Sequence, residues 1–200
     1  MKKVMSLVMV LVCFAAMAGC GTDKQTGGEV KYKPGTFTKE DFALINTEKN
    51  VTFTLGMTKE EVESVLGKEV EVVNNRNYVY SDGIYIIYRN DKIVSLSIDN
   101  VDEDKYDLPY KTVRGIQLYD TKKKVQEVYG EFDCKYGGTY YLNEETGKSY
   151  MEKLPDFKPE WAKGDLTKTY IIDMRNIKGD EETNITQITI SDGENCWNHK

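Results

Sequence analysis

The stretch 55–67 carries apolar residues at the spacing of an α-helix. Three of them fall at positions i, i+3 and i+4 and so share one helix face: Val62, Val65 and Leu66. Thr58 and Glu61 form a capping box, in which each side chain accepts a hydrogen bond from the backbone N–H of the other residue. Gly67 is a typical residue just past the last turn. The pattern predicts a short helix that begins after Thr58 and ends at Gly67.

Strand-like segments follow this helix. β-branched and aromatic residues are concentrated at 77–80, 84–89 and 92–99, and turn-forming residues separate these segments at 81–83 and 90–91. A helix with so narrow an apolar stripe cannot fold alone and needs a sheet to pack on. The pattern therefore predicts one short helix packed on an antiparallel β-meander.

The same pattern returns further along the chain. A shift of 63 residues aligns capping and packing positions of two helices: Thr58 with Thr121, Val62 with Val125, and Gly67 with Gly130. A shift of 92 residues aligns apolar strand positions: Ile93 with Ile185, Leu96 with Ile188, and Ile98 with Ile190. The difference of 29 residues predicts an insertion in the second copy, near 137–168. The predicted fold class is α+β, with two tandem units, 37–104 and 105–200, that form one shared or continuous sheet.

The beginning of the chain has the pattern of a secretion signal. Two lysines precede an apolar run at 4–17, and its 14 residues are fewer than the roughly 20 needed to span a bilayer. Small residues then lead to Cys20. We predict a signal peptide at 1–19 and, from the polar and glycine-bearing composition that follows, a flexible tether at 20–36.

The end of this signal resembles the bacterial lipobox. Its residues are Met17, Ala18, Gly19 and Cys20, with methionine where leucine is usual. The resemblance implies cleavage before Cys20 and lipidation of that cysteine, so that acyl chains hold an extracytoplasmic protein on the cell membrane. It does not indicate which membrane. Ordinary cleavage with release of the protein is the alternative.

Charge argues against several classes of partner. The 200-residue chain has a formal net charge of −6, and loss of two lysines with the signal makes it −8. An acidic surface is a poor match for nucleic acid and for anionic lipid. The acidic stretch 99–107 lacks the glycine and the distal glutamate of an EF-hand loop, so we interpret it as a solvated linker and predict no metal site. No motif predicts a cofactor.

The cysteines leave two alternatives open. Cys13 leaves with the signal and Cys20 is assigned to lipid, so Cys134 and Cys196 remain. An even pair outside the cytoplasm allows a disulfide, and two free thiols are the alternative. A nucleophilic thiol would need a nearby histidine, and the only histidine of the chain is His199, close to its end. Thiol catalysis is therefore not predicted.

The predicted insertion is rich in aromatic residues. The candidates for a partner-binding surface are Tyr140, Tyr141, Phe157 and Trp161. Aromatic side chains contribute large contact areas at little entropic cost, which favours a binding site. The alternative is that they fold back onto the sheet as a plug, because monomers rarely expose aromatic patches.

The second predicted helix begins with three lysines, Lys122, Lys123 and Lys124, where the first has Lys-Glu-Glu. Each exposed lysine there opposes the helix dipole by roughly 0.3–1 kcal/mol. An anionic partner at the helix N-terminus would offset this cost, so the lysines are candidate partner-binding residues. The alternative is a solvated face on which Lys123 pairs with Glu127, one turn on.

These features together resemble a known group of proteins. The motif Leu-Gly-Met-Thr at 55–58, the Val and Leu-Gly that end its helix, and the Tyr-Ser-Asp-Gly-Ile turn at 80–84 occur in a secreted chain with an altered second copy. This combination resembles the beta-lactamase-inhibitor-like superfamily and the small outer-membrane-assembly lipoproteins. The resemblance implies protein binding through a concave sheet rather than catalysis. The shared residues are capping and packing residues, so the resemblance transfers no binding residue.

Two functions follow as hypotheses. The first is a membrane-anchored binding module for a protein or a cell-envelope polymer, with tyrosines such as Tyr78 and Tyr80 on an exposed sheet face. The second is an envelope-directed hydrolase that uses carboxylates such as Asp82 or Asp173 as acid and base. Every acidic residue also has an explanation as a turn or surface residue, so the sequence favours the binding module and predicts no catalytic residue.

Overall fold

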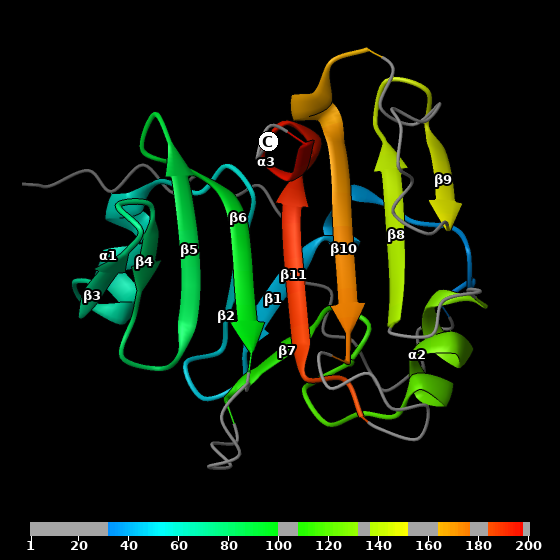
Figure 1. Cartoon of the computed structure of the whole chain (residues 1–200), viewed down its shortest axis with the longest axis horizontal. Coiled ribbons are helices and arrows are strands. Elements are labelled where there is room, and N and C mark those ends of the chain that lie inside the picture. The colour runs from blue at the N-terminus through cyan, green and yellow to red at the C-terminus, as the bar shows by residue number, and fades with distance from the viewer. Residues whose placement is uncertain (1–31, 100–107, 132–136, 152–163, 177–183, 198–200) are drawn as a thin grey trace, which may run out of the picture. The chain divides into compact units, whose positions relative to one another are not determined.

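An antiparallel sheet of eight strands is the main element of the protein (Figure 1). Its strands, in sheet order, are β3 (Glu71–Val73), β4 (Asn77–Val79), β5 (Ile84–Arg89), β6 (Lys92–Asp99), β11 (Gln187–Asp192), β10 (Thr169–Arg175), β8 (Gly137–Asn143) and β9 (Lys148–Met151). We call β3–β6 the first half of the sheet and β8–β11 the second half. With its helices, the protein belongs to the predicted α+β class.

The computed structural model describes residues 32–99, 108–131, 137–151, 164–176 and 184–197. The predicted signal peptide, the lipidation site and most of the tether lie outside these ranges. Within them, no helix has the length and the apolar character needed to cross a membrane.

The helix predicted from the sequence forms as α1 (Lys59–Leu66). Its capping box is complete, because Thr58 Oγ1 accepts from Glu61 N at 3.2 Å and Glu61 Oε2 accepts from Thr58 N at 2.8 Å. Gly67 ends it with a φ of 79°, a conformation that favours glycine. The predicted strands also form, and Asn90 and Asp91 make the β5–β6 turn with positive φ values. The local prediction for this part of the chain is confirmed.

The second predicted helix forms as α2 (Lys122–Tyr129), with Thr121 as its N-cap and Gly130 at its end. Because Lys124 occupies the place of Glu61, α2 keeps only the bond from Lys124 N to Thr121 Oγ1, at 3.2 Å. The second half of the sheet differs from the first in chain order, since its outermost strand is β9, which follows β8 in sequence.

A second, three-stranded sheet lies behind the large one in Figure 1, in the order β2 (Val51–Thr54), β1 (Ala43–Asn46) and β7 (Tyr110–Thr112). The main core lies between the two sheets and the helices. It combines apolar side chains of the large sheet with Val62 of α1, Val125 of α2 and Phe53 of β2, all fully buried. We call the side of the large sheet that meets this core its inner face, and the opposite side its outer face.

A buried ion pair joins the first described residues to the rest of the fold. Arg114 donates from Nε to Asp41 Oδ1 at 2.9 Å and from Nη2 to Oδ2 at 2.7 Å. Its Nη atoms also donate to the carbonyl oxygens of Thr36, at 2.5 Å, and of Val128 in α2, at 3.2 Å. Loss of one partner of such a buried pair costs about 3–5 kcal/mol. The chain therefore enters the domain at a fixed place beside α2.

Candidate functional site

The two faces of the large sheet carry different side chains. Side chains of a strand point alternately to opposite faces. On β5 and β6, Ile84, Ile86, Leu96 and Ile98 point inward and are fully buried. The residues between them point outward, and most are polar. Among the described residues, neither α1 nor α2 lines this outer face, which makes it the candidate surface for a partner.

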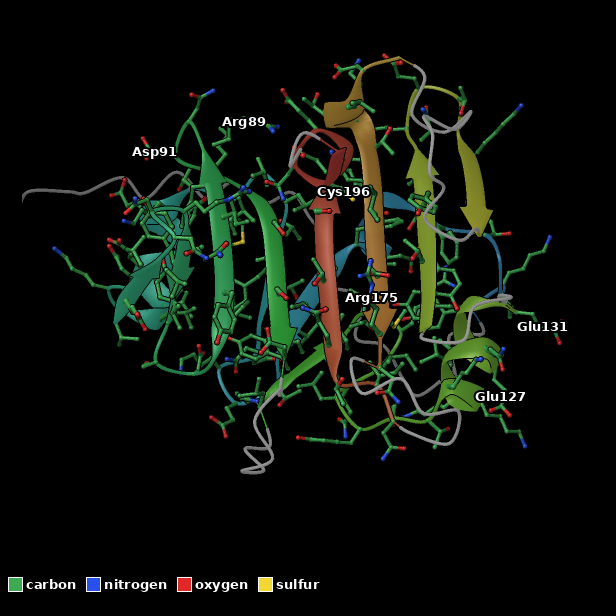
Figure 2. The ribbon with its side chains drawn as sticks, viewed as in Figure 1. Arg89, Asp91, Glu127, Glu131, Arg175 and Cys196 are labelled. Atoms are coloured by element: carbon green, nitrogen blue, oxygen red, sulfur yellow. The ribbon has the colours of Figure 1, made fainter. Side chains whose placement is uncertain are left out.

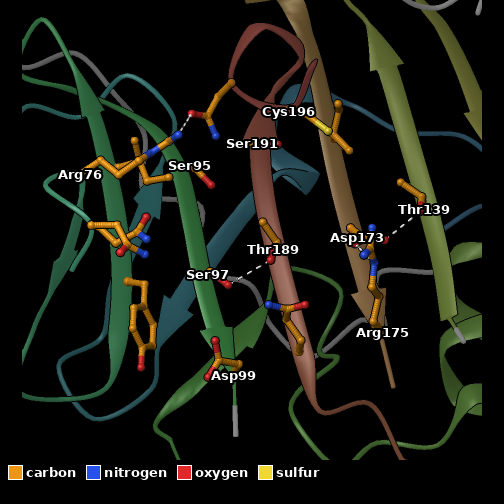
Figure 3. Close-up of a pocket in the computed structure, with 17 residues that line it drawn as sticks. Arg76, Ser95, Ser97, Asp99, Thr139, Asp173, Arg175, Thr189, Ser191 and Cys196 are labelled. Atoms are coloured by element: carbon orange, nitrogen blue, oxygen red, sulfur yellow. Dashed lines mark hydrogen bonds and ion pairs between the residues drawn. The ribbon is translucent and has the colours of Figure 1, made fainter. Parts of the chain in front are cut away.

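The outer face forms an open groove of about 600 Å³ (Figure 3). Both halves of the sheet line it, from β4 and β5 on one side to β8 and β10 on the other, with β6 and β11 in the middle. The short helix α3 (Gly193–Trp197) adds Asn195 and Cys196 at one end. We call this surface the outer groove.

One row of paired residues crosses the middle of the outer groove. In sheet order it consists of Tyr85, Ser97, Thr189, Asp173 and Thr139, each paired with the next across neighbouring strands. At its centre the hydroxyls of Ser97 and Thr189 are hydrogen-bonded at 3.0 Å. Strand spacing makes the row roughly 19 Å long from end to end. Residues more than 100 positions apart in sequence thus form one continuous polar strip.

Asp173 is the central charged group of the second half. Thr139 Oγ1 donates to its Oδ1 at 2.7 Å, and Arg175 forms an ion pair with its Oδ2 through Nε. Burial raises the pKa of Asp173, while the charge of Arg175 and the hydrogen bond from Thr139 oppose part of that rise. The Arg175 side chain is 43% exposed, so the rest of its guanidinium faces the groove.

Polar contacts hold α3 at the end of the outer groove. Asn195 N donates to Asp192 Oδ1 at 2.7 Å, and Asn195 Oδ1 accepts from Arg76 Nη2 at 3.0 Å, across the groove. Arg89 pairs with Asp192 at 2.5 Å and with Glu194 at 3.0 Å. Figure 2 shows Arg89 on the first half and Cys196 on α3 near this junction. These contacts fix the helix relative to both halves of the sheet.

The thiol of Cys196 lies beside a small apolar cluster on the outer face, formed by Tyr141, Ile171 and Leu166. Burial raises the pKa of Cys196, and the nearby charge of Asp173 raises it further. A thiol with a raised pKa is not an activated nucleophile. Cys196 is a free cysteine in the structure, and Cys134 lies outside the described residues, so their pairing stays a prediction.

The aromatic binding surface predicted for the insertion is wrong for Tyr140 and Tyr141. Both side chains are fully buried, Tyr140 in the main core and Tyr141 in the small apolar cluster of the outer face with Ile171, Leu166 and Cys196. Tyr140 faces the main core, where its ring packs against Phe37 and Tyr129 and its hydroxyl donates to Gly130 O at 3.1 Å. The two tyrosines are packing residues, as the alternative of a fold-back onto the sheet proposed. Phe157 and Trp161 lie outside the described residues.

The predicted exposure is wrong for Tyr80, and Tyr78 is only half-buried. Tyr80 is buried with its hydroxyl 2.7 Å from that of Tyr88, and Tyr78 packs against the main core with Lys59 Nζ above its ring. The tyrosine that faces the outer groove is Tyr85. Its position between Ile84 and Ile86 is a signal that sequence reasoning missed, since the two isoleucines fix the inner face of β5.

Two of the three lysines at the start of α2 form ion pairs with acidic residues in or next to the same helix. Lys124 Nζ lies 2.8 Å from Asp120, and Lys123 Nζ lies 3.9 Å from Glu127. Figure 2 shows Glu127 on α2, at the margin of the sheet. These pairs support the interpretation of Lys122, Lys123 and Lys124 as a solvated helix face.

The two carboxylates of the hydrolase hypothesis do not share a site. Asp82 Oδ2 accepts from Asn46 at 3.0 Å and from Tyr110 at 2.6 Å, and so links the β4–β5 turn to the small sheet. Asp173 lies in the outer groove. Among the described residues, no three His, Cys, Asp or Glu side chains come together in a way that could hold a metal ion.

Comparison with known proteins adds a family but no activity. No curated protein matches the chain. A solved structure, a cysteine-rich secretory protein from Staphylococcus aureus subsp. aureus Mu50, is similar over 70% of this chain and 45% of its own, at 13% identity and a TM-score of 0.40. The chain thus spans less than half of that protein, and a likeness this low carries no argument. The model of a family of unknown function, DUF6727, matches residues 20–149, and the chain belongs to that family.

Proposed function

We propose that the protein is a membrane-anchored extracytoplasmic lipoprotein that acts as a binding module for a protein or a cell-envelope polymer. The observation that carries this proposal is the outer groove, a polar surface built from both halves of the sheet. A broad, shallow and charge-bearing face suits the recognition of an extended partner. Hydrolysis has less support, because Asp82 and Asp173 serve separate contacts.

The anchor is proposed from the front of the chain. The apolar run and the residues before Cys20 support cleavage there, with lipid on the new N-terminus. The test is fractionation of cells that express the wild type or the Cys20→Ser variant. The wild type is expected in the membrane fraction, and the variant is expected to leave it. A variant that stays wholly with the membrane would overturn the anchor.

We also propose that the two halves of the sheet belong to tandem units that share it. In support, β6 and β11 pair with Ser97 opposite Thr189, and these two residues are related by the same 92-residue shift as the apolar positions beside them. If a two-fold axis relates the two copies, equivalent residues must face each other where the copies meet. Ser97 and Thr189 do so. Starting from this pair, the strand registers match Tyr85 with Asp173 and Ile87 with Arg175. We call these matched positions.

The binding role is tested by photo-crosslinking in whole cells. A benzoylphenylalanine placed at Gln187, in the outer groove, is expected to capture the partner, which mass spectrometry then identifies. The matched control is the same substitution at Thr52, an exposed strand residue of the small sheet. Adducts specific to Gln187 support the proposal. Equal adducts from both sites, or none from Gln187, would contradict it.

A further inference from the structure

The middle of the outer groove presents hydroxyl groups. Ser97 of β6 and Thr189 of β11 are half-buried there, whereas the neighbouring Ser95 and Ser191 line the groove but are buried (Figure 3). Each hydroxyl has one donor and two acceptor positions. The Ser97–Thr189 bond uses one donor and one acceptor, so the pair keeps both capacities for a ligand. Groups that both donate and accept, such as ligand hydroxyls and amides, match this surface better than carboxylates or ammonium groups do.

Among the described residues, the formal charges that line the outer groove cancel. Arg76 and Arg175 contribute two formal positive charges, and Asp99 and Asp173 contribute two negative ones, in a chain whose net charge is −6. A polyanion would meet the aspartates, and a polycation would meet the arginines. Charge complementarity therefore favours an uncharged ligand.

The backbone under the groove is not available for recognition. The four strands that form its floor, β5, β6, β11 and β10, all have neighbours on both sides. An extended peptide that adds to a sheet needs a free strand edge for its main-chain hydrogen bonds. Recognition on the floor of the outer groove therefore comes from side chains, which favours a ligand rich in its own hydroxyl groups over a peptide that adds as a strand.

The first half adds an apolar platform. Tyr85 and Ile87 are half-buried on the outer face, at the matched positions of Asp173 and Arg175. A sugar ring has one flat side of C–H groups that packs on an aromatic ring, while its rim of hydroxyls needs polar partners. The groove offers the ring at one side, and the carboxylate and guanidinium at the other.

We infer that the outer groove binds an uncharged glycan chain. Tyr85 and Ile87 pack against one sugar ring, the hydroxyls of Ser97 and Thr189 bond to the next, and the Asp173–Arg175 pair binds neighbouring hydroxyls further along. Arg175 donates its terminal N–H groups, and Asp173 accepts. This inference rests on the proposed binding function and names the chemical class of the partner.

The test is isothermal titration calorimetry with the full-length protein. The probes are two uncharged tetrasaccharides, chitotetraose and cellotetraose, with tetragalacturonate as the charged comparison and an uncharged octapeptide for the alternative class of partner. At least one uncharged tetrasaccharide is expected to bind. Tyr85→Ala and Arg175→Leu are each expected to weaken that binding about tenfold or more, as loss of a ring contact or of charged hydrogen bonds does.

Controls separate binding from folding. Thr52→Val, on the small sheet, is expected to leave the affinity unchanged. The outer-face variants are compared only if their thermal melting matches the wild type, and Tyr85→Phe, which keeps the ring, is expected to bind nearly normally. The inference is overturned if neither tetrasaccharide binds, if binding survives both groove substitutions, or if tetragalacturonate or the peptide binds as tightly.

The outcome also separates this inference from the proposed function. If the sugars fail but the crosslinker at Gln187 captures a protein, the groove is a binding site for another class of partner, and only the glycan inference is lost. If the sugars fail and Gln187 captures nothing, the binding function fails as well.

Discussion

Matched positions of β5 and β10 show where the two halves of the large sheet agree and where they differ. On the inner face, Ile84 and Ile86 of β5 correspond to Ile172 and Met174 of β10, and all four are fully buried. On the outer face, Tyr85 and Ile87 correspond to Asp173 and Arg175. The same strand geometry therefore carries an aromatic and aliphatic pair in one half and an ion pair in the other.

The difference shows which constraint acts on each face. Close packing penalises a change of volume or polarity in the core, so the inner positions keep apolar residues of similar size. The four outer positions are half-buried and are packed less closely, so they tolerate a wider range of residues. A consistent change there, from apolar to charged at two neighbouring positions, makes the groove chemically asymmetric. The predictions below test the shared core first and the divergent face afterwards.

The largest effect is expected from truncation of matched core residues. Ile86→Ala and Met174→Ala each remove a fully buried side chain, and each is expected to lower the free energy of unfolding by about 2–5 kcal/mol. Urea denaturation measures this loss of unfolding free energy. Ile87→Ala, on the outer face of the same strand, is the matched control and is expected to cost less. A core substitution that costs no more than this control would break the comparison.

The helix caps are expected to give the next largest effect. Thr58→Ala removes the two hydrogen bonds of the Thr58 hydroxyl in α1, which accepts from Glu61 N and donates to Glu61 Oε2, whereas Thr121→Ala removes the single cap bond of α2. Losses of about 1 kcal/mol are typical, and the loss at Thr58 should be the larger. Denaturation of both variants, with Thr→Ser at each position as the conservative control, measures this difference. Equal losses would show that the bond from the Thr58 hydroxyl to the Glu61 carboxylate adds nothing to the cap.

A smaller effect is expected where the two halves meet. Ser97→Ala and Thr189→Val each remove one hydroxyl of the 3.0 Å pair at the centre of the outer groove. Each is expected to cost roughly 0.5–1 kcal/mol, and the double variant should cost less than the sum because both remove the same bond. A double-mutant cycle measures the coupling. Strict additivity would mean that the hydroxyls do not stabilise the pairing of β6 and β11.

Asp173 is expected to make the stability of the protein depend on pH. Burial raises the pKa of Asp173 in the folded protein, so the folded state holds its proton more tightly than the unfolded chain does. The stability due to the protonated carboxyl is present below about pH 4, the ordinary aspartate value, and is lost as pH rises through the raised pKa. Relative to Asp173→Asn, the wild type should therefore lose stability as pH rises from about 4 toward neutrality.

Urea denaturation at several pH values measures this slope. Tyr85→Phe, at the matched position of the first half, changes no group that titrates between about pH 4 and 7 and should run parallel to the wild type. If the free energies of unfolding of the wild type and Asp173→Asn differ by the same amount at every pH, Arg175 and Thr139 fully offset the effect of burial on the pKa of Asp173.

Much of the fold could be predicted because its signals are local. The caps of α1 and α2 lie within four residues of the groups they bond, and the strands of the first half are separated by recognisable turns. The insertion misled the prediction because Tyr140 and Tyr141 stand in a polar neighbourhood in sequence. Their burial comes from residues distant in sequence, because Tyr140 packs in the main core and Tyr141 packs against Ile171 and Cys196.

The outer groove could not be predicted as a site. Its central row takes one residue from each of five strands. None of these residues forms a motif with its sequence neighbours. The alternation of side chains along β5 puts Tyr85 on the face opposite to Ile84 and Ile86. It does not indicate which face of the sheet other elements will cover. That depends on where the small sheet and the helices pack.

By itself, the sequence determined the capped helices, the strand alternation, the repeated pattern and the acidic charge, since each depends on residues close together in the chain or on composition alone. Only the tertiary structure decided that β6 would pair with β11, which tyrosines would be buried, and which face would stay open. Those outcomes depend on contacts between residues tens to more than a hundred positions apart, and the hydrophobic effect that drives such contacts is non-directional. Apolar patterning specifies that a face is buried, but not what buries it.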